Sequence, residues 1–114
     1  MRDAIPQDVI DAIKPGVSVA SLDKIARDHI KSKGYGQYFI HRTGHGIGLY
    51  PHENPSLKNA DSTILKEGMA LTVEPGIYIS GIGGMRHSDT VLVTVDGNIE
   101  MTSAPKDLES LIIE

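Results

Sequence analysis

The residues with the clearest potential for chemistry lie between His41 and Glu53, where three of the chain's five histidines fall within thirteen positions. Gly44, Gly46 and Gly48 are interleaved with them. Glycine lets a backbone approach a neighbouring strand or ligand where no side chain would fit. Imidazole is the commonest protein metal ligand and titrates near neutrality. The segment therefore predicts a metal or substrate site, with a glycine-rich strand and turn carrying half-exposed polar histidines as the alternative.

A carboxylate, Glu74, is the second candidate group, because it directly follows the mostly apolar, strand-like segment 69–73. A carboxylate at the end of such a run is costly to bury unless a metal, a cation or hydrogen bonds compensate it. The proline and glycine that follow fix the exit of the chain and could aim the side chain. His45, His52 and Glu74 together would suit zinc, manganese, iron or cobalt.

One residue of the next strand-like segment could complete such a site. Alternation along a strand places Arg86, Ser88 and Thr90 on one face, with His87 and Asp89 on the other. A salt-bridged strand surface is the alternative explanation for the arginine and the aspartate.

The composition of the 114 residues fits one small domain, with 39% apolar residues, one Phe and no Trp. The net charge of -4, with both signs interspersed, argues against a nucleic-acid or anionic-membrane surface. Without cysteine the chain has no disulfide and no thiolate zinc site. No apolar run approaches the ~20 residues of a membrane span, and no signal-peptide core is present. We therefore expect a soluble cytoplasmic protein.

The elements that must position these residues are predicted from hydrophobic periodicity and turn signals. The pattern predicts two helices followed by an antiparallel sheet, an α+β arrangement. The helices are expected at 7–14 and at 21–33, the second with Ser21 as its N-cap. Strands are expected at 38–42, 69–73, 76–80 and 86–95, with a loop at 54–67 and a turn at 81–84. Asp96-Gly97 predicts a hairpin with a return strand at 98–101, and a short helix is expected at 105–111.

Four motifs in this order resemble the pita-bread metallopeptidases, a family that includes Xaa-Pro dipeptidase (prolidase), aminopeptidase P, methionine aminopeptidase and the metal-free relative creatinase. The motifs are Gly44–Gly48, Pro51–Glu53, Val73–Gly76 and Arg86–Val93. The resemblance runs from about Ala12 to Pro105 and is closest to Xaa-Pro dipeptidases, through residues 40–45 and 66–69. It implies that residues 1–114 form one partial domain, the C-terminal half of a pita-bread catalytic domain.

The resemblance also implies roles for particular residues. In such enzymes two divalent ions, such as Mn, Co or Zn, share two Asp, one His and two Glu. It places a metal ligand at His45, and at Glu74 a second ligand that is also the general base. His52 would contact the substrate carbonyl and the developing tetrahedral intermediate. His41 and Arg86 would contact the small peptide substrate or support the metal site.

Two departures from the family pattern bear on activity. The paired aspartates belong to the half of the fold upstream of Lys14, and Asp23 and Asp28 lie on a helix in the wrong context to replace them. Ser88 stands where the bridging glutamate is expected, and a neutral hydroxyl cannot bridge two cations as a carboxylate does. We therefore expect the chain alone to be inactive, and in isolation it could hold no metal.

Three functional classes remain open on the sequence. The first is a metal-dependent hydrolase of peptides with proline in second position. The second is a metal-free, creatinase-like hydrolase, supported by Ser88 and by the set His45, His52, Glu74 and Arg86. The third is a non-catalytic pseudo-peptidase that serves as a binding module. Open sheet edges and an uncovered apolar face further predict self-association, most simply as a homodimer.

Overall fold

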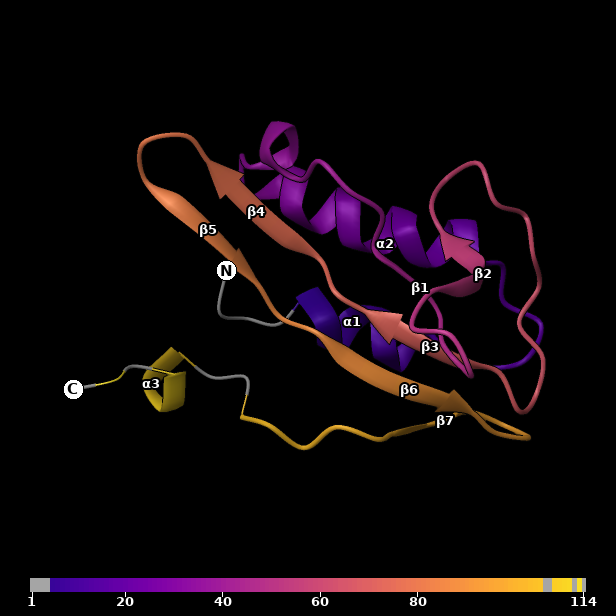
Figure 1. Ribbon diagram of the computed structural model, residues 1–114. Helices are drawn as coiled ribbons and strands as arrows, with labels where there is room; N and C mark the ends of the chain where they lie inside the picture. Colours follow the sequence, from indigo (N-terminus) through magenta and orange to yellow (C-terminus); the bar gives the residue numbers. More distant parts are fainter. Residues whose placement is uncertain (1–4, 106–107, 112, 114) are drawn as a thin grey trace.

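The computed structural model describes residues 5–105, 108–111 and 113. In this part of the chain, two helices lie on one face of an antiparallel sheet, and a two-stranded arm extends from it (Figure 1). The helices are α1 Ile5–Asp11, α2 Val19–Ser32, a 3-10 helix at Gly36–Tyr38 and α3 Leu108–Leu111. The strands are β1 Gly44–Gly46, β2 Glu53–Leu57, β3 Ala70–Val73, β4 Gly76–Ile79, β5 Gly83–Arg86, β6 Asp89–Val93 and β7 Asn98–Glu100.

The sheet has the order β2-β1-β3-β6-β7, and β4 pairs with β5 in the arm. Two helices followed by an antiparallel sheet confirm the predicted α+β arrangement. The hairpin at Asp96-Gly97 is also confirmed, since β6 pairs with β7 and Thr94 N–H donates to the Gly97 carbonyl at 3.0 Å. None of the helices in the described ranges is long and apolar enough to cross a membrane.

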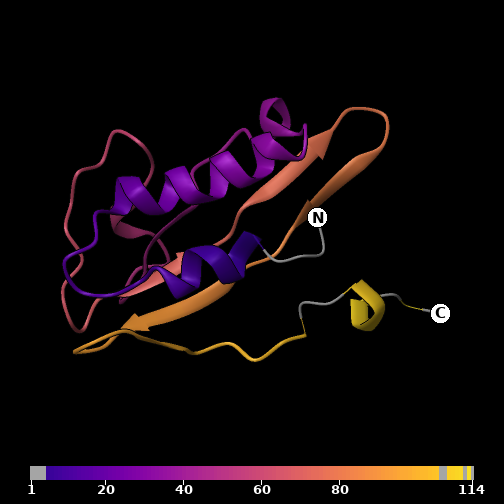
Figure 2. The same cartoon turned by 180° about the vertical axis from the view of Figure 1, so that it is seen from behind.

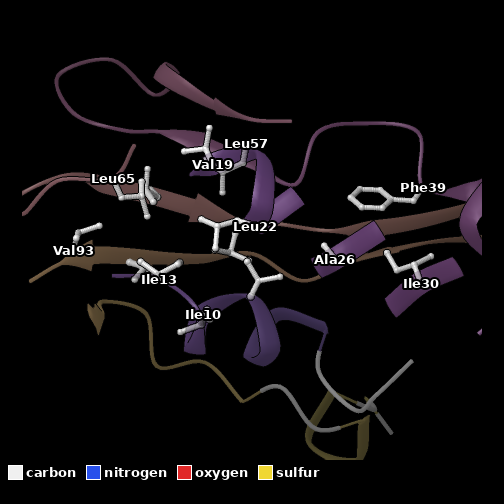
Figure 3. Close-up of a cluster of buried hydrophobic side chains, with 14 of the residues drawn as sticks. Ile10, Ile13, Val19, Leu22, Ala26, Ile30, Phe39, Leu57, Leu65 and Val93 are labelled. Atoms are coloured by element: carbon white, nitrogen blue, oxygen red, sulfur yellow. The ribbon is translucent and has the colours of Figure 1, made fainter. Parts of the chain in front are cut away.

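The view from behind shows the two helices lying against the sheet (Figure 2), and the close-up shows the hydrophobic side chains packed between them (Figure 3). Helix α2 contributes the apolar stripe that its periodicity predicts. The buried apolar residues are Val9, Ile10, Ile13, Val19, Leu22, Ala26, Ile30, Phe39, Leu57, Leu65, Leu71, Val73, Ile77, Val91 and Val93. Most of these residues come from α1, α2 and the strands β2, β3, β4 and β6, so packing of the core holds in place the strands that carry the candidate site.

Helix boundaries differ from the prediction by a few residues. Ser18, rather than Ser21, is the N-cap of α2, because its hydroxyl accepts from the Ser21 N–H at 3.2 Å. Helix α1 ends at Asp11, short of the predicted residue 14. The predicted terminal helix is found only as α3, and residues 106–107 lie outside the described residues.

The predicted strand at 38–42 is wrong. Its first residue, Tyr38, ends the 3-10 helix, and two carbonyls of the rest are bonded by a side chain instead of a neighbouring strand. The Arg27 guanidinium donates to the Phe39 carbonyl at 3.1 Å and to the His41 carbonyl at 2.7 Å. A long-range contact from α2 has therefore replaced the ladder that the local pattern suggested.

The predicted loop at 54–67 is wrong in its first part, where β2 forms. Gly44 pairs with Leu57 and His45 with Ser56, and the register shifts before Gly46. Proline is tolerated in a strand at a sheet edge, and β2 is such an edge. Pro55 therefore led to the prediction of a loop, although a strand that contains proline is possible at the edge of the sheet.

The predicted strand at 86–95 is two strands, separated at His87 and Ser88. The neighbouring strand is interrupted at the same level, since Glu74 and Pro75 separate β3 from β4. Pro75 lacks the N–H that a ladder needs. The predicted turn at 81–84 is shorter than expected, because residues 83–84 belong to β5.

Gly44 shows why the glycines of the central segment are needed. A Cβ built on Gly44 would lie 1.8 Å from the Thr72 carbonyl oxygen on β3. No side chain can occupy that space without separating β1 from β3. The expected close approach of two backbones is confirmed at this position.

We predict that Gly44→Ala lowers the free energy of unfolding by about 3 kcal/mol or more. Overpacking typically costs ~1–3 kcal/mol, and the overlap here is severe. The matched control is Gly97→Ala, whose added Cβ would approach only the Thr94 hydroxyl, at 4.0 Å. Urea unfolding of both variants measures the difference. Equal stabilities for the two variants would contradict the close approach.

Candidate active site

The buried carboxylate of Asp23 belongs to a hydrogen-bond network that supports the candidate site. Asp23 on α2 is fully buried, and it accepts hydrogen bonds from Arg27 Nε at 2.7 Å and from the Thr43 hydroxyl at 2.8 Å. A desolvated carboxylate needs such partners. Thr43 in turn donates its N–H to the Leu57 carbonyl, and its own carbonyl accepts from Glu74 N–H at 2.7 Å. The network therefore ties α2 to the backbone of the candidate base.

His45 is held in one tautomer. The backbone N–H of His45 donates to the Thr72 hydroxyl at 3.1 Å, and the ring Nδ1 lies 2.8 Å from the Gly46 carbonyl oxygen. A carbonyl only accepts, so Nδ1 carries the proton and Nε2 keeps its lone pair when the ring is neutral. Nε2 lies 3.6 Å from Glu74 Oε1. The imidazole therefore presents a metal-binding nitrogen to the carboxylate.

The pairing register explains which residue meets the other oxygen of Glu74. Val73 pairs with Asp89 and Gly76 with Arg86, so counting inward places Glu74 opposite Ser88. The Ser88 hydroxyl lies 3.3 Å from Glu74 Oε2, in a long hydrogen bond. The two carboxylate oxygens therefore meet different groups, a histidine and a serine.

His52 lies at the rim of this cluster. It is exposed in the segment between β1 and β2, and its ring centroid is 4.4 Å from that of His45. The structure therefore brings together His45, His52, Glu74 and Ser88.

His41 and Arg86 lie beyond this cluster, along the arm. His41 Nδ1 is 2.7 Å from the Arg42 carbonyl oxygen, which leaves Nε2 to accept from the Tyr78 hydroxyl at 2.9 Å. Arg86 is exposed and pairs across the arm with Gly76. The Cβ atom of Arg86 and the Tyr78 hydroxyl both adjoin the space over that glycine.

Asp89 has a structural place on the opposite face. It is buried, its Oδ2 lies 3.4 Å from His87 Nε2, and its Oδ1 accepts from the Thr102 hydroxyl at 2.6 Å. Because Asp89 is buried, it does not belong to the salt-bridged strand surface that was the alternative explanation for this residue. The expected side-chain alternation agrees with the contact between His87 and Asp89.

The donors that face each other fit one side of a metal site. Ligands at tetrahedral angles and bonds of about 2.1 Å lie ~3.4 Å apart, close to the 3.6 Å between His45 Nε2 and Glu74 Oε1. The hydrogen bond from His45 to a backbone carbonyl is the usual support of a metal-binding histidine. Within the described residues no group of three or more His, Cys, Asp or Glu could hold a metal. This pair therefore fits a metal as part of a larger ligand set.

The supporting residues Asp23, Arg27 and Thr43 were not predicted as part of the site. The spacing of the aspartate and the arginine, four residues apart on a helix, indicates an ion pair. No local signal shows that the threonine, twenty residues further on, completes it.

Comparisons with known proteins show which family and which solved structures this chain resembles. Residues 3–95 match the profile of metallopeptidase family M24. The Xaa-Pro dipeptidase of Pyrococcus furiosus is 52% identical over 99 residues, which cover 87% of this chain and 28% of that protein. The solved prolidase from Pyrococcus furiosus superposes with a TM-score of 0.87 at 50% identity, over 89% of this chain and 30% of its own. The Xaa-Pro dipeptidase from Bacillus anthracis gives 0.88 at 50% identity, over 91% and 29%.

We predict that Thr43→Val lowers the free energy of unfolding by about 1–3 kcal/mol, because it leaves a buried oxygen of Asp23 without its donor. Thr63→Val is the matched control, since it removes a similar hydroxyl from Asp61 at the surface, where water can replace it. The control should cost about 0.5 kcal/mol or less. Denaturant unfolding measures both, and a Thr43 variant as stable as the control would contradict the supporting role of the network.

Proposed function

The chain belongs to metallopeptidase family M24, and we propose that it supplies one part of the active site of an Xaa-Pro dipeptidase. The pairing of His45 Nε2 with Glu74 Oε1, with Nδ1 held by a backbone carbonyl, carries the proposal. The likeness to Xaa-Pro dipeptidases supports the substrate class, a small peptide with proline in second position. A divalent Mn, Co or Zn ion, when bound, would polarise the scissile carbonyl and activate water.

In this proposal each residue has a task set by its position. His45 holds the cation through Nε2 and is kept in the correct tautomer by the Gly46 carbonyl. Glu74 takes up the proton of the attacking water as general base. His52, exposed at the rim, donates to the carbonyl oxygen as negative charge develops there. Arg86, the last residue of β5, lies two positions before Ser88 and binds the substrate carboxylate through its guanidinium.

The remaining ligands come from outside this chain. The chain spans less than a third of the length of the relatives that it matches. The described residues contain a pair of suitable donors but no complete group. We therefore propose that residues 1–114 are one partial domain, inactive by itself, whose site is completed by a further segment.

A second candidate function is favoured by one observation, the serine beside Glu74. A neutral partner at Oε2 is compatible with a hydrolase in which His52 and Glu74 act without metal. Metal analysis separates the two candidates, because a metal-free hydrolase would keep its activity after chelation. A non-catalytic binding module would hold peptides without hydrolysing them.

We predict that the full-length protein hydrolyses Xaa-Pro dipeptides in a metal-dependent way, and that Glu74→Gln lowers kcat at least about 100-fold. Glu67→Gln, an exposed carboxylate away from the site, is the control and should retain full activity. The isolated 114-residue chain should show no turnover in the same assay. Metal-dependent turnover by the purified isolated chain would contradict the proposed incomplete site.

We also propose that the arm pairs with a second copy. One side of it has a hollow of about 350 Å³ lined by Tyr35, Ile77, Ile79, Ile82, Gly83, Gly84 and Met85. Ile82 is 83% exposed there, and apolar surface of this kind marks association sites.

We predict a dimer at high micromolar concentration, weakened by Ile82→Asp because the change places a charge in the apolar contact. The control is Val95→Asp, which adds the same charge at another exposed apolar residue but lies at the β6–β7 turn, at the far end of the sheet from the arm (Figure 1). Sedimentation velocity measures both. A monomeric wild-type chain, or equal weakening by the two changes, would count against pairing through the arm.

A further inference from the structure

We propose that Ser88 makes this a site for one divalent cation and orients Glu74 as its ligand. The inference rests on the proposed function, because it takes His45 and Glu74 to be the ligands that this chain supplies. It goes further in assigning the number of ions and a positioning role for the serine.

The first step is the division of the Glu74 carboxylate between two neighbours. Oε1 faces His45 Nε2 at 3.6 Å, and Oε2 faces the Ser88 hydroxyl at 3.3 Å. This arrangement follows from the register, which stays in step across the gap between the β3–β6 and β4–β5 ladders and so places Glu74 opposite Ser88. The hydroxyl therefore lies on the side of the carboxylate away from the histidine, where a second ion would have to bind.

The second step concerns charge. Two dications held about 3.5–4 Å apart repel each other and are stabilised by carboxylates that both ions share. Ser88 contributes a neutral oxygen at the position beside Oε2. A hydroxyl hydrogen donated to Oε2 also competes with a cation for the lone pairs of that oxygen. One ion at Oε1 is therefore favoured, and a second at Oε2 is disfavoured.

The third step is the orientation of Glu74. The Glu74 side chain is only partly buried, so packing alone does not fix the rotation of its carboxylate about the Cγ–Cδ bond. The bond to Ser88 at one oxygen turns the other towards His45. Hydrogen-bonded partners of metal ligands commonly change metal affinity by about 10–100-fold, and the long bond here points to the lower end.

The donor set indicates the class of cation. One imidazole nitrogen and one carboxylate oxygen suit borderline ions such as zinc, cobalt or manganese, and offer no sulfur for softer ions. Manganese is a useful probe because a single ion and a spin-coupled pair have different magnetic resonance spectra.

The experiment measures bound metal in the full-length protein, loaded with manganese and then separately with zinc. Elemental analysis gives the stoichiometry, and paramagnetic resonance shows whether manganese ions are paired. We expect one ion per chain in the unaltered protein and two in Ser88→Glu, with a spin-coupled spectrum. Ser88→Ala should keep one ion with affinity roughly tenfold weaker. Ser80→Glu adds the same charge at an exposed position of the arm and should remain at one ion.

Several outcomes would overturn the inference. Two ions in the unaltered protein would do so without any variant, so the test does not depend on Ser88→Glu folding. A folded Ser88→Glu that stays at one ion, or unchanged metal affinity in Ser88→Ala, would also overturn it. Metal that persists in both His45→Ala and Glu74→Gln would instead show that the proposed ligands are wrong.

Discussion

The buried carboxylate of Asp23 is the constraint on which the site depends. A charge removed from water is tolerated only when its hydrogen-bonding capacity is met, and here Arg27 and Thr43 meet it. Arg27 also binds the Phe39 carbonyl, so the chain entering β1 is held against α2. Through the Thr43 carbonyl the same network reaches the backbone of Glu74. The position of the candidate base is thus set by a charge with no part in the proposed chemistry.

A second constraint is the unbroken register from β3 and β6 into the arm. The ladder is interrupted at Pro75, yet the pairing on both sides continues in step. Cross-strand neighbours share a face of the sheet, so the interruption turns the chain without moving Glu74 away from Ser88. The Glu74 carboxylate therefore stays partly exposed, with His45 of β1 near one oxygen and Ser88 near the other.

Membership of the metallopeptidase family and the residue at position 88 have separate consequences. The motif order identifies which side chains could bind a metal, and the fold brings His45, His52 and Glu74 together as those motifs imply. The chain shares the fold of the relatives that it resembles. In the proposed function, Ser88 bears on the charge of the site and leaves the pairing of the strands that carry it as it is.

The sequence by itself determined the features that depend on neighbouring residues. The apolar stripe of α2, the turn at Asp96-Gly97 and the requirement for small residues at Gly44 all follow from local periodicity or from the absence of a side chain. The ordered motifs also identified His45 and Glu74 as candidates. Their roles as ligands stay predictions, but their proximity follows from the fold.

Only the tertiary structure decided features whose partner atoms lie far along the chain. Whether residues 38–42 form a strand depended on Arg27, which took the carbonyls that a ladder would have used. Whether Pro55 interrupts a strand depended on its place at a sheet edge. Which ring nitrogen of His45 carries the proton depended on the Gly46 carbonyl, whose direction is fixed by the backbone of β1. Local patterns carry no record of these partners, because each is brought into contact by the packing of the sheet against the helices.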